Sequence, residues 1–409
     1  MLQRKSTDWA VIAMVNNTLG NIYRALSGEH SGERQAAELA LAQGAYTEAW
    51  EATPPDHASR LGFAIDLAEM LRDLPTRSAE QLELLIAVQT EIRDRRRGED
   101  DPGWPVSADL LGDAYRERAE SRSDPAAREE DLALALAAYT EAWDASSRRH
   151  DNLLDLAIDL ADALMRLAAR SAEQLELLIA VQTEIRDRRR AAGDPGWPVS
   201  ADLLGRAHRE RAESNADPAA REEDLALALA AYTQAWDTTP ADHDNRLDFA
   251  IHLASGLMRL AARSPEQLEL LIAVQTEIRD RRRGAGNPAW PEAADLLGMA
   301  YQERAESRSD PAAREEDLAL AVAAYTQAWE ATPPDHDNRL RFAIDLANAL
   351  VVQAAIRPVR RMDGRAVVDH ALDLVASAIT DRELDRLSEL RRLLPVLSVQ
   401  LVRRQWSLI

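Results

Sequence analysis

Clusters of arginine are the side chains in this sequence with the most evident potential chemistry. The stretch LELLIAVQTEIRDRRR occurs three times without a change, at 82–97, 175–190 and 268–283. Adjacent guanidinium groups can bind phosphate or an acidic partner, and stacked copies would form a basic ladder along one edge of the protein. That ladder would consist of Arg95, Arg96, Arg97, Arg188, Arg189, Arg190, Arg281, Arg282 and Arg283.

The same arginines also fit the end of a helix, which is the interpretation we favour. Cations at a helix C-terminus oppose the helix dipole and bond to its last carbonyls. Glu91 precedes Arg95 by four residues, the favourable order for an ion pair. No aromatic residue is interleaved with the arginines to stack on bases, and the net charge of −21 repels nucleic acid and anionic lipid. We therefore expect no nucleic-acid partner and no membrane partner.

Four histidines recur beside acidic residues and raise the question of a metal site. They are His57, His150, His243 and His336, in PDHASR, RRHDNL, ADHDNR and PDHDNR. An Asp and a His that are adjacent in the chain cannot all point at one ion, so we predict no metal site. The neighbouring Asp and Asn residues are instead expected to cap the helix that follows.

The composition argues against an enzyme. Cysteine is absent and Lys5 is the only lysine, which removes thiol nucleophiles, thiolate metal sites, and P-loop or Schiff-base lysines in the body of the chain. There is also no Gly-rich phosphate loop and no Ser-His-Asp signature. We predict no catalytic residue and no cofactor.

The chain shows no targeting or membrane-spanning signal. The first twenty residues contain only a short apolar run, and no run elsewhere reaches the length of a membrane span. The expectation is a cytoplasmic protein. Abundant Ala and Arg with almost no Lys are typical of a GC-rich bacterial genome.

A repeat of 93 residues organises the chain. The pentapeptide YTEAW occurs at 46–50 and 139–143, and YTQAW follows at 232–236 and 325–329. Each unit predicts four helices: Asp-Pro as at Asp124-Pro125 opens one, Ser78 with Gln81 forms a capping box for another, and Trp-Pro opens a third. No segment alternates as a strand would, so the fold class is all-α.

Four helices per unit imply about eight antiparallel helix pairs. One pair cannot bury its apolar face alone, and stacked pairs form a continuous core, the arrangement of an α-solenoid. We assign residues 1–356 to this solenoid, built on a double repeat of 93 residues. We assign residues 357–409, which leave the repeat, to a C-terminal capping pair of helices.

One pair in each unit resembles the tetratricopeptide repeat (TPR), in which L-G-x-x-Y is followed by A-x-x-x-F/Y-x-x-A and a closing Pro. The matching residues are Leu111, Gly112, Tyr115, Ala135, Tyr139 and Ala142; Leu19, Gly20, Tyr23, Ala42, Tyr46, Ala49 and Pro54; and Leu297, Gly298, Tyr301, Ala321, Tyr325, Ala328 and Pro333. The pairs are longer than the usual repeat, and His208 replaces the first Tyr in one copy. In this lengthened form they look like the TPR arrays attached to CHAT proteases of actinobacteria, with no protease part.

The resemblance implies a right-handed superhelix whose first helices line a concave groove that binds a protein partner. Positions where near-identical copies differ would give this groove its chemistry, although neutral drift at exposed sites explains the same variation. In the TPR-like pairs these positions are Asn21, Arg24, Asp113, Arg116, Arg206, Arg209, Met299 and Gln302. The other pair of each unit, which we call the alternate pair, differs between copies at two positions. One carries Glu69, Asp162, Ser255 or Asn348, and the other carries Arg72, Met165, Met258 or Val351.

The predicted function is a non-enzymatic scaffold that binds a partner protein or peptide in the groove. Two alternatives stay open at this point. Near-identical units and an apolar C-terminus also suit a self-assembling homo-oligomer, as a dimer or a filament, and the groove also suits a regulator that senses a peptide.

Overall fold

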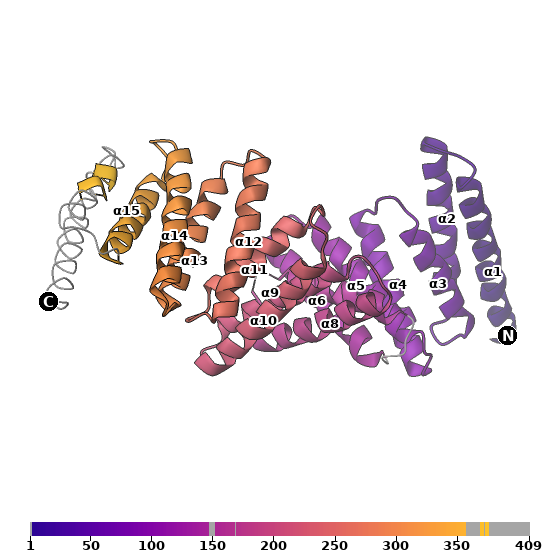
Figure 1. Cartoon of the computed structure of the whole chain (residues 1–409). Coiled ribbons are helices and arrows are strands. Elements are labelled where there is room, and N and C mark those ends of the chain that lie inside the picture. The colour runs from indigo at the N-terminus through magenta and orange to yellow at the C-terminus, as the bar shows by residue number, and fades with distance from the viewer. Residues whose placement is uncertain (1, 147–151, 168, 357–368, 372, 376–409) are drawn as a thin grey trace. The chain divides into compact units, whose positions relative to one another are not determined.

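The computed structural model describes residues 2–146, 152–167, 169–356, 369–371 and 373–375 (Figure 1). Within these residues the regular structure is α-helical and contains no strand. The helices are α1 Leu2–Ser27, α2 Glu33–Ala52, α3 Ser59–Arg72, α4 Ala79–Gly98, α5 Trp104–Ser121, α6 Pro125–Ala145, α7 Leu153–Met165, α8 Ala172–Ala191, α9 Trp197–Ser214, α10 Pro218–Thr238, α11 Arg246–Met258, α12 Pro265–Gly284, α13 Trp290–Ser307, α14 Pro311–Ala331 and α15 Arg339–Ile356.

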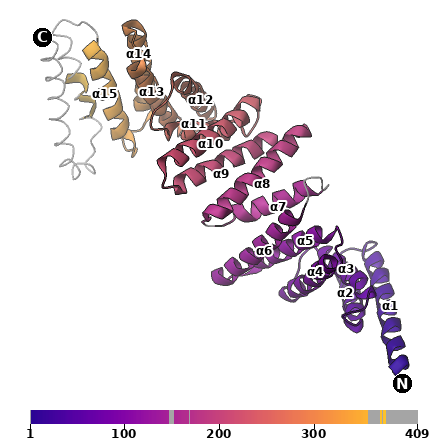
Figure 2. The ribbon, with the colours of Figure 1, turned by 90° about the horizontal axis from the view of Figure 1, so that it is seen from below.

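The chain divides into two compact units, Met1–Ala207 and His208–Ile409, with the boundary inside α9. In each unit helices that follow one another in sequence lie side by side as hairpins (Figures 1 and 2). In the first unit α1 also contacts α3, and α5 contacts α7; in the second, α13 contacts α15. Even-numbered helices make no such contacts among the described residues. The odd-numbered helices are therefore the inner, more crowded layer of each unit.

This arrangement confirms the all-α solenoid predicted from the repeat. Helix starts also follow the predicted signals. Ser78 Oγ accepts from the Gln81 backbone N–H at 3.3 Å while the Gln81 side chain accepts from the Ser78 N–H at 2.8 Å, and the same capping box opens α8 and α12. Asp124, Asp217 and Asp310 cap the helices that begin at the following proline.

The first helix of the alternate pair in the second unit, α11, ends at Met258. Beyond it Arg263 folds back and donates to the carbonyl oxygens of Leu257 and Met258 at 2.8 and 2.9 Å, which satisfies the end of the helix. The capping pair assigned to 357–409 lies outside the described residues, apart from the helical segments 369–371 and 373–375.

A glycine and a tyrosine set the closest helix approach in three of the TPR-like hairpins. Gly20, Gly112 and Gly298 lie against the rings of Tyr46, Tyr139 and Tyr325, which are at most 2% exposed. A Cβ added to Gly112 would lie 2.7 Å from ring carbons of Tyr139. Any side chain there would force the two helices apart, so these positions require glycine.

Replacing Gly112 by alanine tests this packing. We expect Gly112→Ala to lower the free energy of unfolding by about 1–3 kcal/mol, because the methyl group overpacks a full site. Gly44→Ala is the matched control: a Cβ there would meet nothing within 4 Å, and alanine in a helix should stabilise by about 0.5–1 kcal/mol. Urea denaturation followed by circular dichroism measures both, and equal effects would contradict the packing argument.

Candidate functional site

The arginines of the repeated RDRRR segment bond mainly to neighbouring parts of the chain. Arg95 pairs with Glu91 at 3.1 Å, as predicted. Arg96 Nη1 donates to Ser107 Oγ at 2.9 Å, which joins the end of α4 to the start of α5. Arg97 pairs with Glu141 and places its guanidinium 5.4 Å from the ring centroid of Trp104. With Trp104, Leu136 and Glu141 it also lines a cavity of about 850 Å³.

The other two copies repeat these contacts. Arg188 and Arg281 pair with Glu184 and Glu277, and Arg189 donates to Ser200 Oγ at 3.0 Å. Arg282 donates to the carbonyl oxygen of Ala289 at 3.2 Å. Arg190 and Arg283 lie 5.4 and 5.1 Å from the ring centroids of Trp197 and Trp290. The nine ladder arginines thus close the helix ends, and their availability to a partner stays a hypothesis.

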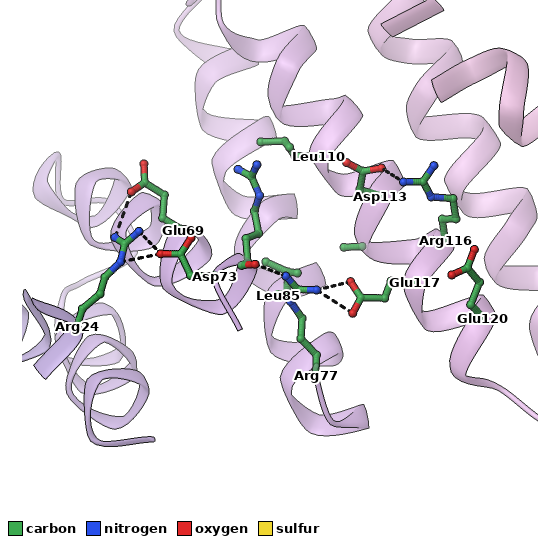
Figure 3. A pocket seen from close by; sticks show the side chains of 12 residues that line it. Arg24, Glu69, Asp73, Arg77, Leu85, Leu110, Asp113, Arg116, Glu117 and Glu120 are labelled. Carbon is green, nitrogen blue, oxygen red and sulfur yellow. Dashed lines mark hydrogen bonds and ion pairs between the residues drawn. The ribbon is translucent and has the colours of Figure 1, made fainter. Parts of the chain in front are cut away.

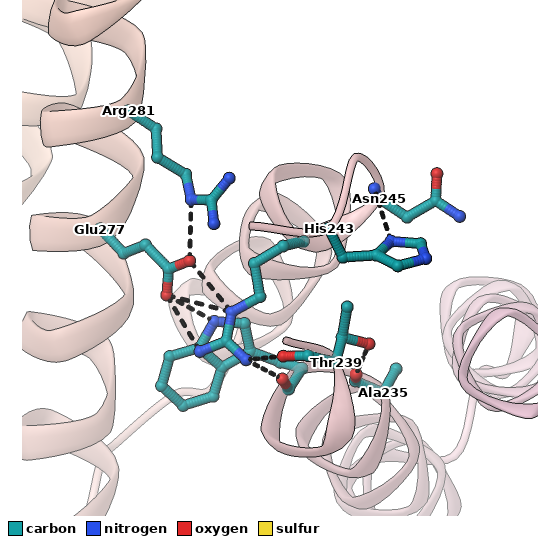
Figure 4. A network of polar contacts seen from close by, with 8 residues as sticks. Ala235, Thr239, His243, Asn245, Glu277 and Arg281 are labelled. Atoms are coloured by element: carbon teal, nitrogen blue, oxygen red, sulfur yellow. Dashed lines mark hydrogen bonds and ion pairs between the residues drawn. The ribbon is translucent and has the colours of Figure 1, made fainter. Parts of the chain in front are cut away.

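A second set of arginine contacts joins the alternate pairs α3–α4 and α11–α12 to the helix before each pair (Figure 4). Arg246, at the start of α11, donates to the carbonyl oxygens of Trp236 and Thr239, which end α10. Its guanidinium also pairs with Glu277 of α12 at 3.0 Å and lies 4.4 Å from the ring centroid of Trp236. Arg60 makes the same contacts with Trp50, Thr53 and Glu91. One side chain therefore ties three helices together.

At the start of the alternate pairs, the histidine side chains accept the hydrogen bonds expected of their Asp or Asn neighbours. His57, His243 and His336 each accept on Nδ1 from the backbone N–H two residues later at 3.1 Å. The Asn245 side chain makes no capping hydrogen bond, so the Asn and Asp caps expected there are wrong for this copy. His150 lies outside the described residues. Among the described residues no three His, Asp or Glu side chains form a group that could hold a metal ion.

A cavity of about 650 Å³ opens on the inner helices of the first unit (Figure 3). It is lined by α1, α3 and α5, the turn after α3, and one residue of α4. Most of its lining is charged: Arg24, Glu69, Arg72, Asp73, Arg77, Asp113, Arg116, Glu117 and Glu120, with Leu85, Leu110 and Ala114. We call this cavity the charged pocket.

Ion pairs fix most of the arginines in the charged pocket. Arg24 Nε donates to Asp73 at 2.9 Å and its Nη1 to Glu69 at 3.3 Å, which joins α1 to α3 (Figure 3). Arg116 pairs with Asp113 at 2.6 Å. Asp113 also accepts from the buried Tyr139 hydroxyl at 2.9 Å, so its carboxylate is oriented from the core.

The pair between Arg77 and Glu117, at 2.6 Å, belongs to the scaffold. Arg77 also donates to the carbonyl oxygen of Leu71 at 2.6 Å and thereby ends α3. Arg263 and Glu303 repeat the pair in the second unit at 2.5 Å.

Arg72 differs from the other lining arginines. Its side chain is exposed, and its guanidinium makes no hydrogen bond or ion pair with any residue that the structure describes. Desolvating an unpaired cation is costly unless a partner supplies an anion. Arg72 is therefore the lining cation that remains free to bind a ligand.

The structure brings together five of the sixteen groove positions predicted from sequence. They line the charged pocket and are Arg24, Glu69, Arg72, Asp113 and Arg116. Asn21 accepts from the Tyr46 hydroxyl at 2.9 Å, and Gln302 from the Tyr325 hydroxyl at 3.4 Å. Arg209 lies 3.6 Å from Glu213. The other positions are exposed or half-buried outside the pocket: Arg206, Met258 and Met299 are exposed, and Asp162, Met165, Ser255, Asn348 and Val351 are half-buried.

The prediction missed four charged residues of the pocket. Asp73 is replaced by Arg166 and Arg259 at the corresponding positions, so comparison of the copies could have found it. Arg77, Glu117 and Glu120 are the same in the three copies of their segments, and their position in the pocket depends on the packing of α5 beside α3.

Buried carboxyl groups lie beside the charged pocket between α5 and α7. Asp109 is 8% exposed, and its Oδ1 has no hydrogen-bond donor within the described part of the chain. Burial, followed by the charges of Asp159 and Asp113, raises the pKa of Asp109 to about 8. Burial and Asp113 raise the pKa of Asp159 to about 6. In the second unit burial and Asp345 raise the pKa of Asp295 to about 7.

Comparisons with known proteins assign this chain to no family. No protein-family model and no curated protein matches the sequence. Among solved structures, the TPR2AB domain of yeast Sti1 in complex with pHSP90 shares 13% identity over 83% of this chain and 99% of that chain, with a TM-score of 0.29. BtubC from P. vanneervenii shares 16% identity over 74% and 92% of the two chains, with a TM-score of 0.27. Scores this low define no common family, so the fold assignment depends on the helix packing described above.

In the described part of the chain no helix is both long and apolar enough to cross a membrane.

The three-helix cluster around Arg246 predicts a large effect on stability. Arg246→Leu should lower the free energy of unfolding by about 1–3 kcal/mol, because it leaves two helix-end carbonyls without this donor and removes one of the two cations, Arg246 and Arg281, that pair with Glu277. Arg246→Lys should recover less than half of the loss, since an ammonium cannot reproduce the planar fork. Arg128→Leu, at an exposed position of α6, is the control. Thermal unfolding followed by circular dichroism measures all three, and full recovery by lysine would contradict the role of the fork.

The buried carboxyl groups predict a pH dependence of stability. The folded pKa of Asp109, about 8, lies above the ordinary value for an unfolded chain, so the folded state holds a proton that the unfolded state releases. Its contribution is complete below the unfolded pKa and is lost as pH rises toward 8. We expect the thermal midpoint to fall between pH 5 and pH 8, and Asp109→Asn to reduce that fall by at least about 2–4 °C, the equivalent of about 1 kcal/mol.

Glu130→Gln is the control for the pH measurement, because Glu130 is exposed on α6. It should leave the dependence between pH 5 and pH 8 unchanged. An identical fall in the wild type and in Asp109→Asn would show that Asp109 is ionised in the folded protein over this range.

Proposed function

We propose that this chain is a non-enzymatic protein-interaction scaffold, and that the charged pocket binds a segment of a partner protein. One observation carries the proposal: the pocket lies on the inner helices and gathers five of the groove positions at which the repeated copies differ. At several of the corresponding positions the second unit carries uncharged side chains. Ser255, Met258 and Met299 stand there in place of Glu69, Arg72 and Asp113.

The charges left open in the pocket suggest the chemistry of the partner. Arg72 pairs with no anion among the residues that the structure describes, so it favours an acidic side chain or a terminal carboxylate of a partner. Glu69 and Glu120 are about half exposed, and their single ion pairs to Arg24 and Arg166 leave acceptor positions free for a basic group. A polar segment with charges of both signs fits the pocket better than an apolar helix, since only three lining residues are apolar.

Selection of peptides from a random displayed library against the full chain, followed by titration calorimetry, tests the proposal. Arg72→Glu should weaken the selected peptide at least 10-fold, about 1.4 kcal/mol, because it places a like charge against the acidic group of the peptide. Asp113→Asn should weaken it less. The amide keeps the acceptor for the Tyr139 hydroxyl, as Asn21 does for Tyr46, but removes the charge.

Arg128→Glu makes the same charge change outside the pocket and should leave the affinity within about twofold. Equal losses in Arg72→Glu and Arg128→Glu would mean that binding follows net charge alone. Tight peptides that are insensitive to both pocket variants would place the binding site elsewhere.

A further inference from the structure

An exposed apolar stripe follows one face of α1. It consists of Ile12, Val15, Leu19, Ile22 and Leu26, whose exposed fractions are 49%, 52%, 38%, 49% and 37%. Val11, 55% exposed, lies beside it. We call these six residues the α1 seam. It is independent of the charged pocket, and the proposed function does not use it.

The spacing of the seam is that of a helix–helix contact. From Ile12 to Leu26 the intervals are three, four, three and four residues, the heptad pattern that keeps one apolar line facing a second helix. The line extends over about 21 Å of helix at 1.5 Å per residue. Scattered exposed hydrophobic residues are ordinary on a protein surface, but a contiguous stripe marks a contact.

The same face is buried in the other TPR-like hairpins. Leu111 and Ala114 of α5 correspond to Leu19 and Ile22, and each is 1% exposed because α4 packs over them. Leu297 and Ala300 of α13 are buried in the same way under α12. This face is therefore built to receive a helix. In α1, which lies at the edge of the first unit, the described contacts are with α2 and α3 alone (Figure 1).

Substitutions in α1 make the seam more apolar than its covered counterparts. Val15 stands where α5 has Ser107 and α13 has Ala293, and Leu26 stands where they have Arg118 and Arg304. A helix at the edge of a repeat array that faces water should instead carry a polar outer face. The change toward larger apolar side chains indicates that the seam is covered in the functional protein.

We infer that a second copy of α1 covers the seam and that the protein is a homodimer. The seam and its flanks, Thr18 and Ala25 on the side of Val11 and Asn16 and Tyr23 on the other, carry no formal charge. Two identical helices can therefore meet there without like-charge repulsion, although each chain has a net charge of −21. A self-complementary patch of this kind gives a closed two-fold contact.

The area agrees with a specific dimer. From their exposed fractions, the six seam side chains offer on the order of 500 Å² per copy, so that complete burial in two copies would reach about 1,000 Å², the lower limit for a specific interface. Aliphatic side chains make up the centre of the contact, as they do in a two-stranded coiled coil.

Size-exclusion chromatography with light scattering, on the full chain, tests the inference. The wild type should elute as a dimer at tens of micromolar, and the double variant Leu19→Glu, Ile22→Glu should be a monomer with unchanged helicity. Leu41→Glu is the matched control, since Leu41 is a leucine on α2 that is more exposed than Leu19, 52% against 38%, and it should stay dimeric. A monomeric wild type at several hundred micromolar would overturn the inference, and so would a dimer that survives the double variant.

Cross-linking gives an answer that does not depend on how well the glutamate variant folds. The chain contains no cysteine, so Leu19→Cys and Leu41→Cys each introduce a single thiol. A short bismaleimide should couple Leu19→Cys into a covalent dimer and leave Leu41→Cys largely monomeric. Equal coupling of the two variants, or coupling of Leu41→Cys alone, would place the contact outside the seam. If another segment of the same chain covered the seam, Leu19→Cys would stay uncoupled.

Discussion

The close packing of a glycine against a tyrosine ring is the constraint on which the rest of the repeat depends. Gly20, Gly112 and Gly298 admit the rings of Tyr46, Tyr139 and Tyr325 at distances that no Cβ permits. The ring is buried, but its hydroxyl reaches the inner face, where it donates to Asn21, Asp113 or Gln302. The residue that sets helix spacing thus also orients a side chain of the inner surface. This arrangement lets the acceptor vary between copies while the core stays the same.

Arginine supplies most of the polar connections between helices. A guanidinium can bond to helix-end carbonyls, pair with a carboxylate and stack on a ring at the same time, which a lysine ammonium cannot do. Arg246 does all three with Thr239, Glu277 and Trp236. The near absence of lysine is therefore consistent with the structural uses of arginine. It also explains why RDRRR resembles a binding motif in the sequence, although its arginines bond largely within the chain.

The helix starts could be predicted because their capping contacts are local. The contacts that depend on where a side chain points in the folded protein could not. Ser78 with Gln81, and Asp before Pro, depend only on residues a turn apart, and the sequence therefore placed these helix starts correctly. At the alternate pairs the turn after Pro240 returns the His243 N–H to the Pro240 carbonyl at 3.1 Å and points the imidazole at Asn245. Capping preferences favour Asn and Asp, and they take no account of a turn that directs the histidine to this position. In the charged pocket, likewise, variation between copies indicated Arg24 and Asp113. Which arginines of the pocket form ion pairs, and which one does not, depends on distances between helices that no spacing in the sequence specifies.

One inner position shows how copies with the same packing acquire different electrostatics. Asn17 donates to Asp66 at 2.9 Å between α1 and α3, so this carboxylate is satisfied by a neutral amide. At the corresponding positions of α5 and α7 stand Asp109 and Asp159, and at those of α13 and α15 stand Asp295 and Asp345. Two carboxyl groups in one buried site cannot both ionise cheaply, and burial accordingly raises the pKa of Asp109, of Asp159, of Asp295 and of Asp345. The helices at these places belong to the same repeat, and the site differs in one side chain, Asn17 or an Asp. Where the second carboxyl group is present, the helix pair acquires groups whose pKa lies near neutrality, without any change of fold.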